Sequence, residues 1–278
     1  MKAAFIDVFA ASVNGADWKV RAGQYKQPKF PFALGRDFSG VISAVGEDVT
    51  DLRVGDLVFG VCEADQEGAY AEKIAIKAAI VAKKPDGLSH VNAAPLALIG
   101  LTALSAIEDT LKLQPGEIIL IHGGAGGVAS FATQLAKHIG ARVITTASAA
   151  NHEYVRGLGA DENYNAKDFT QFVTGCDAVF DTVGGDVAQR SFAVVKPGGR
   201  AAFIASGPQA PKPNRSDVTS LRPPVGRARR HLERIAHLFQ AGAIRPPEIK
   251  LYRLSEAADA HRLSESRHFR GKLVFQVR

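Results

Sequence analysis

The sequence contains little cysteine and lacks long apolar runs. Its two cysteines, Cys62 and Cys176, are too few for a disulfide framework or for a cysteine-rich structural zinc site. No apolar run approaches the ~18 residues that a helix needs to span a bilayer. Residues 1–5 lead into a strand-like stretch and do not resemble a signal peptide. These absences predict a protein of the reducing cytoplasm that does not enter a membrane.

The charge balance is basic, with a net charge of +6 and a pI of about 9.3. Such an excess favours anionic ligands, nucleic acids among them. Much of it lies in the segment 222–234, where the arginines are spaced as on a solvated helix face. No aromatic-basic motif accompanies them, so we do not expect nucleic acid as a partner. A chain of 278 residues, 46% of them hydrophobic, has room for two globular domains.

Two parts of the sequence differ in their pattern of apolar and turn-forming residues. Residues 1–90 contain short apolar runs broken by Gly, Asp and Pro, which is typical of an all-β domain; the expected strands are 38–45, 57–61, 70–76 and 79–82. From about residue 91, strand and helix patterns alternate, which predicts a parallel, doubly wound sheet. Its expected strands are 117–122, 141–146, 176–181 and 200–205, and its helices 128–139, 151–158, 168–174, 186–195 and 227–241. The proline-rich segment 206–224 is expected to be a loop or a broken edge strand, and 248–278 a strand, a helix and a strand.

A glycine-rich turn follows the apolar run 118–121 and precedes a segment with helical spacing, 128–136. In this context the pattern G-x-G-x-x-[G/A], filled by Gly124, Gly126 and Ala129, predicts a dinucleotide site. Gly124 is expected to permit the tight turn, Gly126 to let a pyrophosphate approach, and Ala129 to keep the helix close to the strand. Free N–H groups at the helix start would hold the phosphates. The alternative is a glycine-rich turn without a ligand. The cofactor contacts expected here are Gly124, Ala125, Gly126, Gly127 and Val128.

Three further segments agree with that turn. They are 11–23, with the pattern S-x-N-x-x-D-x-x-x-R-x-G, 35–58, with G-x-D-x-x-G and G-D-x-V, and 263–274, with R-G-K-L-V. Together these motifs resemble the medium-chain dehydrogenase/reductase superfamily, in its zinc-independent quinone oxidoreductase (zeta-crystallin-like) branch. The resemblance covers nearly the whole chain. It implies an α/β fold with a Rossmann doubly wound parallel sheet over 96–248, a β-rich GroES-like domain over 1–95 and 249–278, and an active site in the cleft between them.

The sequence departs from the zinc alcohol dehydrogenases of that superfamily. Those enzymes carry His-Glu where this chain has Arg36-Asp37, and a catalytic Cys near the position of Asn14. Arginine does not ligate metals, no Cys-x-x-Cys cluster follows, and the histidines are scattered without ligand spacing. We therefore expect no metal. Alcohol oxidation would lack its Lewis acid, whereas a polarised enone or quinone needs only a hydride and a hydrogen-bond donor for the developing enolate.

The resemblance also implies which side chains act on the substrate. Asn14, Asp17 and Arg21 would lie beside the nicotinamide. Asn14 would donate a hydrogen bond to the substrate carbonyl oxygen, and Asp17 would pair with Arg21 to fix the loop. Tyr25 would donate a proton or a hydrogen bond. The alternatives are a purely structural ion pair for Asp17 and Arg21, and simple packing for Tyr25.

The end of the second predicted Rossmann strand favours NADP(H) over NAD. NAD enzymes usually place Asp or Glu there to bind the ribose hydroxyls, whereas this strand runs into Ala147 and Ser148 without a carboxylate. Ser148 would bind a 2′-phosphate, and His152 and Arg156 would substitute for the Arg and Tyr that relatives often carry. The resemblance implies further cofactor contacts at Thr102, Asp181, Gly184, Ala205, Ser206 and Lys272. For Thr102 the alternative is a helix-interior threonine.

These patterns predict an NADPH-dependent, zinc-independent reductase that transfers hydride to quinones or α,β-unsaturated carbonyl compounds. Two alternatives stay open: an enoyl-thioester reductase, and an NADP(H)-binding sensor or structural protein without turnover. The family implies a homodimer, although the prolines of 206–224 remove ladder donors from the edge segment that relatives use. The family's first hairpin has no counterpart before residues 7–10. We therefore expect an exposed apolar sheet face and an unpaired strand edge there, unless another element covers them.

Overall fold

The computed structural model describes residues 3–24, 31–63 and 66–278. The chain divides into two compact units. Unit 1 is Met1–Leu101 together with Arg227–Arg278, and unit 2 is Thr102–Gly226. Unit 2 is thus a continuous segment inserted between the two parts of unit 1.

The return of the chain to unit 1 comes earlier than the boundary expected after residue 248. Residues 227–248 group with unit 1, because the helix in this segment, α6 (Arg229–Gln240), packs against strands β3 (Leu57–Val61) and β5 (Val81–Lys83). One face of α6 is apolar and buried, including Leu232 and Ile235. An amphipathic helix belongs to the unit that covers its apolar face.

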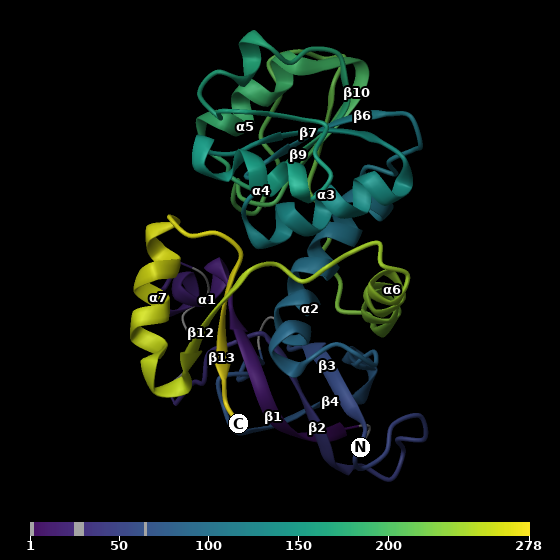
Figure 1. Ribbon diagram of the computed structural model, residues 1–278, viewed down its shortest axis with the longest axis vertical. Helices are drawn as coiled ribbons and strands as arrows, with labels where there is room; N and C mark the ends of the chain where they lie inside the picture. The colour runs from purple at the N-terminus through teal and green to yellow at the C-terminus, as the bar shows by residue number, and fades with distance from the viewer. Residues whose placement is uncertain (1–2, 25–30, 64–65) are drawn as a thin grey trace. The chain divides into compact units, whose positions relative to one another are not determined.

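The strands of unit 1 form one sheet. They are β1 (Ala3–Val13), β2 (Asp37–Val45), β3, β4 (Lys73–Lys77), β5, β12 (Ile249–Arg253) and β13 (Lys272–Gln276). Their order is β12-β13-β1-β2-β3-β5, and β4 pairs with β1. The strands expected at 38–45, 57–61 and 70–76, and the two expected in the tail, are confirmed. The strand expected at 79–82 begins later, at Val81, because Ala78–Ile80 form a 3₁₀ turn. The last strand, β13, lies directly beside the first (Figure 1).

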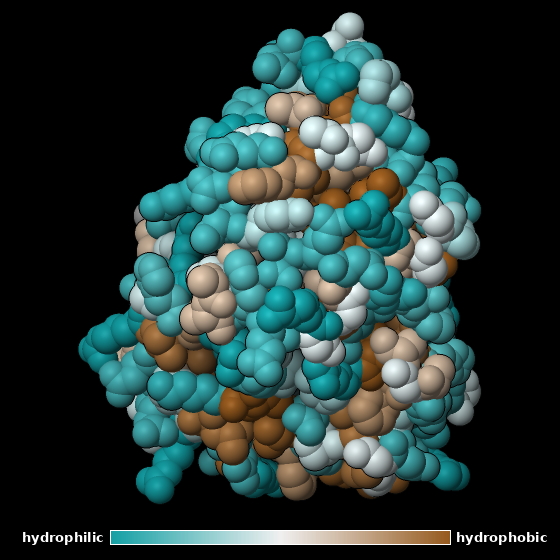
Figure 2. Space-filling model, turned by 45° about the horizontal axis from the view of Figure 1, so that its top comes forward, coloured by the Kyte–Doolittle hydropathy of each residue, from teal (hydrophilic) through white to brown (hydrophobic). Residues whose placement is uncertain are grey.

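The start of β1 only partly matches the expectation of an uncovered sheet. Phe5 of β1 and Leu57 of β3 keep 49% and 43% of their surface exposed. On the face shown in Figure 2, hydrophobic residues form separate patches within a hydrophilic surface. The edge of β1, however, is not unpaired. Strand β2 runs along one edge, and β4 followed by β13 runs along the other.

Helices α1 (Gly15–Arg21), α2 (His90–Leu104) and α7 (Ala257–Ser266) complete unit 1, and α2 leads the chain into unit 2. The stretch His90–Thr110, which is α2 and the π-helical turn after it, is long and apolar enough to cross a membrane by length and composition. The expectation that no such stretch exists was therefore wrong. Since 78% of its most apolar window is buried, packing inside the protein accounts for this composition.

Unit 2 is a doubly wound α/β structure, as expected. Its strands are β6 (Ile118–His122), β7 (Arg142–Thr146), β8 (Glu162–Tyr164), β9 (Cys176–Asp181), β10 (Val195–Phe203) and β11 (Thr219–Leu221). All are parallel, in the order β11-β10-β9-β6-β7-β8. The connecting helices are α3 (Gly127–Ile139), α4 (His152–Gly157) and α5 (Asp186–Ser191) (Figure 1). The helix expected at 168–174 is only a 3₁₀ turn, Phe169–Gln171, because the left-handed Gly175 leads directly into β9.

Strand β6 marks the point where the winding of this sheet reverses. The chain proceeds from β6 to β7 and β8 on one side, and then to β9, β10 and β11 on the other. In open α/β sheets, ligands bind at the carboxyl ends of the strands at such a switch point. A ligand of unit 2 is therefore expected beside the residues that follow β6, β7 and β9.

Candidate functional site

The glycine turn lies at the carboxyl end of β6, and one of its glycines has a different role from the expected one. Gly123 has the left-handed φ of +79°, so Gly123, and not Gly124, makes the tight turn. Gly124 is required for packing, because a Cβ there would lie 2.2 Å from Oγ1 of Thr145. The backbone N–H of Gly124 donates to the carbonyl of Thr146 (2.8 Å), which ties the turn to β7. Ala125 is half-buried.

Gly126, in the next part of the turn, is exposed to solvent. It is the N-cap of α3 with φ of −78°, and the closest atom to a Cβ added there would be the carbonyl oxygen of Gly123, at 3.3 Å. The amides of Gly127 and Val128 open the helix, where N–H groups have no intrahelical acceptor. Ala129 is fully buried, as expected. Free donors, the positive end of the helix dipole and an open glycine together fit the phosphates of a dinucleotide.

The segment after β7 presents one exposed hydroxyl. Ser148 is exposed, and its Oγ accepts a hydrogen bond from Nδ2 of Asn151 (3.0 Å). His152 directs Nε2 at the carbonyl of Ala147 (3.2 Å), so this ring is engaged by the backbone. Arg156 is exposed on α4. Of the groups expected near a 2′-phosphate, Ser148 and Arg156 are the two that solvent reaches freely.

The segment after β9 is shaped by Asp181. Its carboxylate is fully buried and accepts the backbone N–H groups of Val183 (3.0 Å) and Gly184 (2.9 Å). Burial raises the pKa of Asp181, and the two N–H groups oppose that rise. Both oxygens are therefore used to build the turn. A Cβ at Gly184 would lie 2.8 Å from the carbonyl oxygen of Ala205, and Oγ of Ser206 is buried without a hydrogen-bond partner among the described residues.

The structure does not decide the roles of two expected site residues, Thr102 and Tyr25. Thr102 lies inside α2 with 8% of its surface exposed, which is the position of a helix-interior threonine. Its contact with the nicotinamide stays a prediction. Tyr25 lies outside the described residues, and its role stays a prediction as well.

In unit 1, both ends of the Asn14 amide are held by charged side chains. Its Oδ1 accepts a hydrogen bond from Nζ of Lys272 (2.6 Å), and its Nδ2 donates to Oδ1 of Asp37 (2.8 Å). A second contact of Nδ2, to the carbonyl of Ser12, is long at 3.4 Å. The amide is thus oriented from both ends. The N–H directed at Ser12 is the one that a better acceptor would take over.

Lys272 reaches Asn14 from the amino end of β13, 258 residues away in the sequence. Only 4% of its surface is exposed, and Nζ also donates to the carbonyl of Val13 (2.7 Å). Burial lowers the pKa of Lys272, and Asp37 opposes that change. The contacts of Lys272 are therefore protein groups that position Asn14, whereas the resemblance implied a contact with the cofactor.

Asp17 is completely buried at the start of α1, and burial raises the pKa of its carboxyl group to about 7. Its Oδ2 accepts the backbone N–H of Asn14 (2.8 Å) and the hydroxyl of Tyr70 (2.7 Å), which both oppose the rise. Nε of Arg36 lies 3.7 Å from Oδ1. Asp17 thereby fixes the backbone of the residue that carries the Asn14 amide.

Arg21 does not form the expected ion pair with Asp17. Arg21 ends α1 on the side that packs against α7, where its guanidinium contacts Glu265 and lies 3.2 Å from Nδ1 of His261. Nε2 of His261 lies 3.4 Å from the hydroxyl of Tyr70. Burial, and then the nearby Arg21, lower the pKa of His261 to about 4. A polar path therefore joins Asp17 to Arg21 indirectly, through Tyr70 and His261.

Arg36 is also committed to a protein partner. Its Nε and one terminal nitrogen lie 3.1 Å and 2.9 Å from Oε1 of Glu67, which is 2% exposed. Within residues 3–24, 31–63 and 66–278, no cluster of three or more His, Cys, Asp or Glu side chains could hold a metal ion. The position that carries a metal ligand in zinc alcohol dehydrogenases is thus part of an ion pair in this chain.

Three residues of this network were not expected from the sequence. Asp37 lies in the G-x-D-x-x-G pattern, which gave a signal without a role. Tyr70 and His261 gave none, because Tyr70 is 53 residues from Asp17 and His261 is 191 residues from Tyr70 in the sequence. Only the pairing of β1 with β4 and β13, and the contact of α1 with α7, bring them together.

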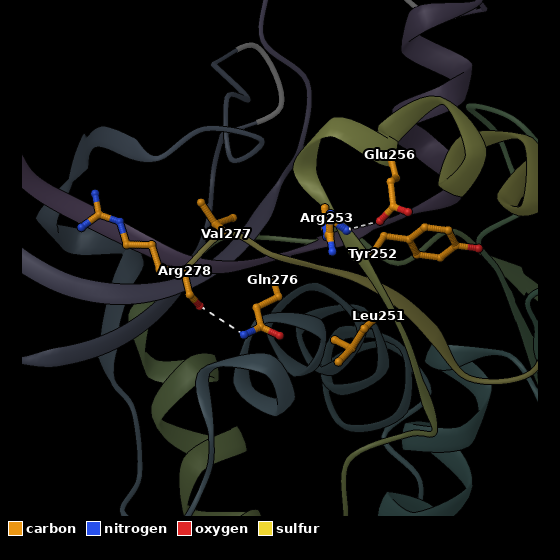
Figure 3. Close-up of a pocket in the computed structure, with 7 residues that line it drawn as sticks. All are labelled: Leu251, Tyr252, Arg253, Glu256, Gln276, Val277 and Arg278. Carbon is orange, nitrogen blue, oxygen red and sulfur yellow. Dashed lines mark hydrogen bonds between the residues drawn. The ribbon is translucent and has the colours of Figure 1, made fainter.

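An open pocket of about 470 Å³ lies at the carboxyl ends of β12 and β13 (Figure 3). It is lined by Leu251, Tyr252, Arg253, Glu256, Gln276, Val277 and Arg278. Glu256 accepts the backbone N–H of Arg253 in its wall. None of the expected site residues lines it, and Lys272 lies at the opposite end of β13. The pocket is therefore separate from the network around Asn14.

Replacement of Tyr70 by Phe is expected to destabilise the protein more at pH 8 than at pH 5. The folded pKa of Asp17 lies above its ordinary value of 3.8, so the contribution of this carboxyl group to stability falls as the pH rises from about 4 to about 7. Without the hydrogen bond from Tyr70, the pKa of Asp17 would rise further, and the contribution of Asp17 to stability would keep falling above pH 7. We expect the free energy of unfolding to drop by about 1 kcal/mol at pH 5 and about 2 to 3 kcal/mol at pH 8, as measured by urea titration.

The matched control is Tyr252→Phe, which removes a hydroxyl from the same unit away from Asp17. It should cost the same small amount at both pH values. Equal losses for Tyr70→Phe at pH 5 and pH 8 would contradict the role given to the Tyr70 hydroxyl.

Two protein-family models match the chain. The alcohol dehydrogenase GroES-like domain matches residues 2–86, and the zinc-binding dehydrogenase family matches residues 158–275. The first range contains the Asn14–Asp17 region and strands β1 to β5. The second runs from the end of α4 to β13.

Curated relatives include two groups of proteins, beside a zinc-type alcohol dehydrogenase-like protein of Staphylococcus aureus that is 32% identical over 98% of this chain. One is the spectinabilin polyketide synthase system protein NorB of Streptomyces orinoci, 33% identical over 98% of this chain. The chain spans only 13% of that protein's length, and similarly small shares of the other polyketide synthases it matches. The other group includes the NADPH-dependent alkenal/one oxidoreductase of Arabidopsis thaliana, 34% identical over 97% of this chain and 70% of that protein.

Solved structures include members of both groups, and also an alcohol dehydrogenase superfamily protein and an NAD-dependent alcohol dehydrogenase. The quinone oxidoreductase from Coxiella burnetii superposes with a TM-score of 0.90 and 34% identity, over 100% of this chain and 91% of that one. A mycobacterial protein complexed with NADPH has a TM-score of 0.86 and 30% identity, over 99% and 92% of the chains. The CurK enoyl reductase has a TM-score of 0.89 and 28% identity, over 99% and 91%.

Proposed function

We propose that this chain, which belongs to the quinone oxidoreductase-like branch of the medium-chain dehydrogenase/reductase superfamily, is an NADP(H)-dependent reductase of quinones or α,β-unsaturated carbonyl compounds. The observation that carries the proposal is the glycine turn after β6, whose open Gly126 and free α3 amides fit a dinucleotide. Relatives that use or bind NADPH support the choice of cofactor. The exposed Ser148, with no carboxylate beside it, supports it as well.

Separate residues of the chain bind the cofactor and the substrate in this proposal. When bound, NADPH supplies the hydride that adds to an electron-poor carbon of the substrate. The amides of Gly127 and Val128 hold the pyrophosphate, and Ser148 binds the 2′-phosphate. Asn14 turns its weakly engaged N–H from the Ser12 carbonyl to the substrate carbonyl oxygen, on which negative charge develops as the C=C bond is broken. Solvent, or Tyr25, returns the proton.

The reaction is proposed to proceed without zinc. The side chains at the ligand positions of zinc alcohol dehydrogenases are Asn14, bound to Lys272 and Asp37, and Arg36, bound to Glu67. Lys272 provides a buried cation beside the amide that contacts the substrate oxygen. A hydrogen bond from an oriented amide is enough to stabilise an enolate-like charge. We further propose a cytoplasmic homodimer, as the family resemblance implies.

A second candidate is an enoyl-thioester reductase. It is favoured by the 33% identity with a polyketide synthase protein over 98% of this chain, and by the fit to the CurK enoyl reductase. The chemistry is the same, because a thioester carbonyl polarises the adjacent C=C bond as a ketone does. The two proposals differ only in what holds the part of the substrate remote from the reacting carbons.

The test is a titration of the purified protein with NADPH and with NADH, followed by nicotinamide fluorescence, and then addition of a para-quinone, an enone or a crotonyl thioester. We expect tighter binding of NADPH than of NADH, and oxidation of NADPH by the quinone or the enone. Oxidation by the thioester alone would favour the second candidate. Binding without oxidation by any acceptor would favour the sensor alternative, and absence of binding would contradict the proposal.

A further inference from the structure

We propose that His122, the last residue of β6, is a positioning residue that holds the glycine turn in the geometry that binds the dinucleotide. The proposal rests on the NADP(H) site proposed above and adds a residue that does not itself touch the cofactor. His122 is fully buried. Among the eight histidines of the chain it is the one that directly precedes the turn.

A continuous series of hydrogen bonds runs through the His122 ring, from the Gly123 N–H to the Val187 carbonyl. Nδ1 lies 3.0 Å from Oγ1 of Thr146, and Nε2 lies 2.9 Å from Oγ of Ser191. The Ser191 hydroxyl donates to the carbonyl of Val187 (2.7 Å), so it accepts from Nε2–H. Oγ1 of Thr146 accepts the N–H of Gly123 (3.3 Å) and donates to Nδ1. Each hydroxyl donates once and accepts once, which assigns the proton of the neutral ring to Nε2.

These hydrogen bonds connect the elements on both sides of β6, where the winding of the sheet reverses. Thr146 is the last residue of β7, and its carbonyl also accepts the N–H of Gly124. Ser191 belongs to α5, the helix that follows β9. The Thr182 hydroxyl, in the turn after β9, donates to the carbonyl of His122 (2.7 Å). The ends of β6, β7 and β9 therefore share one polar anchor directly below the glycine turn.

The environment of the ring permits only the neutral form. Phe169 packs edge-on against it, with ring centroids 4.6 Å apart. Burial, with Arg190 adding a smaller effect, lowers the pKa of His122 to about 3. A second ring proton, on Nδ1, would point at the Thr146 oxygen, so the Thr146 hydroxyl could no longer donate to the ring and its hydrogen would have to rotate away. An apolar residue would fill the same space, but it would leave Thr146 without a fixed direction.

The test compares variants of the intact protein. His122→Leu removes both ring contacts, and Thr146→Val removes the link to the turn while it keeps the side-chain shape. Both should raise the dissociation constant for NADPH at least tenfold and leave kcat within twofold. In the protein without cofactor, amide hydrogen exchange of residues 123–126 should be at least tenfold faster. His122→Asn keeps an acceptor near Thr146 and should restore NADPH affinity to within threefold of the original protein.

The matched control is Val194→Ala, which removes core volume from unit 2 away from the turn. It should lower the Tm as much as Thr146→Val does, yet leave NADPH affinity and exchange at the turn unchanged. If Thr146→Val and His122→Leu behave like this control, His122 is only a core residue and the proposal is overturned. If the original protein binds no NADPH, the proposed function fails, and the exchange rates alone still decide whether His122 positions the turn.

Discussion

Gly126→Ala is expected to raise the dissociation constant for NADPH by about 30-fold, about 2 kcal/mol of binding free energy, with only a small loss of Tm. The reason is the difference between the two states of the site. In the protein alone, the added Cβ would lie 3.3 Å from the Gly123 carbonyl oxygen, a tight contact that a shift of the turn by a few tenths of an ångström relieves, and φ of −78° suits alanine. In the complex, the methyl group would occupy the space that the pyrophosphate needs. Nicotinamide fluorescence and thermal unfolding measure the two effects separately.

The matched control is Gly124→Ala, two residues earlier in the same turn. Its Cβ would lie 2.2 Å from Oγ1 of Thr145, so overpacking should cost about 1 to 3 kcal/mol of stability. Both variants would then lose NADPH affinity, but Gly124→Ala would unfold at a much lower temperature than Gly126→Ala. Unchanged NADPH affinity in a well-folded Gly126→Ala protein would count against the dinucleotide site itself.

Asn14→Ala is expected to lower kcat by about 100-fold or more, the size of effect that follows loss of one oriented donor to a developing oxyanion. NADPH affinity should stay within twofold, since the contacts of Asn14 are to Lys272, Asp37 and the Ser12 carbonyl. Stopped-flow oxidation of bound NADPH by a quinone would measure the chemical step. Full turnover in the variant would remove Asn14 from the mechanism.

Lys272→Met separates the two roles considered for that lysine. If Lys272 only orients Asn14, kcat should fall by about tenfold, and NADPH affinity should be unchanged. If it contacts the cofactor, the dissociation constant should rise instead. Lys272→Met leaves Asp37 buried without its nearest cation, so the Tm of the variant has to be measured together with its activity. The double variant Lys272→Met with Asp37→Asn restores the balance of charge.

Much of the fold followed from local patterns. Four of the six parallel strands of unit 2, namely β6, β7, β9 and β10, were predicted, because each contains a short apolar run bounded by turn residues. Strand β8, Glu-Asn-Tyr, was not predicted, and β11 lies in the segment that was expected to be a loop or a broken edge strand. Helix α2 was not among the predicted helices, since it is apolar on all sides and shows no helical periodicity. The exchange of roles between Gly123 and Gly124 was also beyond the pattern. It depends on a side chain of β7, Thr145, which the spacing of glycines does not reveal.

The sequence predicted which residues belong to the site better than it predicted which partners those residues contact. The family resemblance suggested that Asp17 and Arg21 would pair to fix the loop. The structure instead surrounds Asp17 with Tyr70 and the backbone of Asn14, and gives Arg21 to Glu265 of α7. Which partner a charged residue selects depends on burial and on segments distant in the sequence. Neither is encoded in the motif around residue 17.

The insertion of unit 2 between the two parts of unit 1 sets an order of events during synthesis. Residues 102–226 are continuous and contain every strand of their sheet, so this unit is able to fold as soon as it leaves the ribosome. Unit 1 has to wait. Strand β1 receives β13 only when residues 272–276 have been made, and the Asn14 amide is oriented only by the lysine that begins that strand. A nascent chain would therefore acquire a folded α/β unit well before it acquires an oriented Asn14 amide.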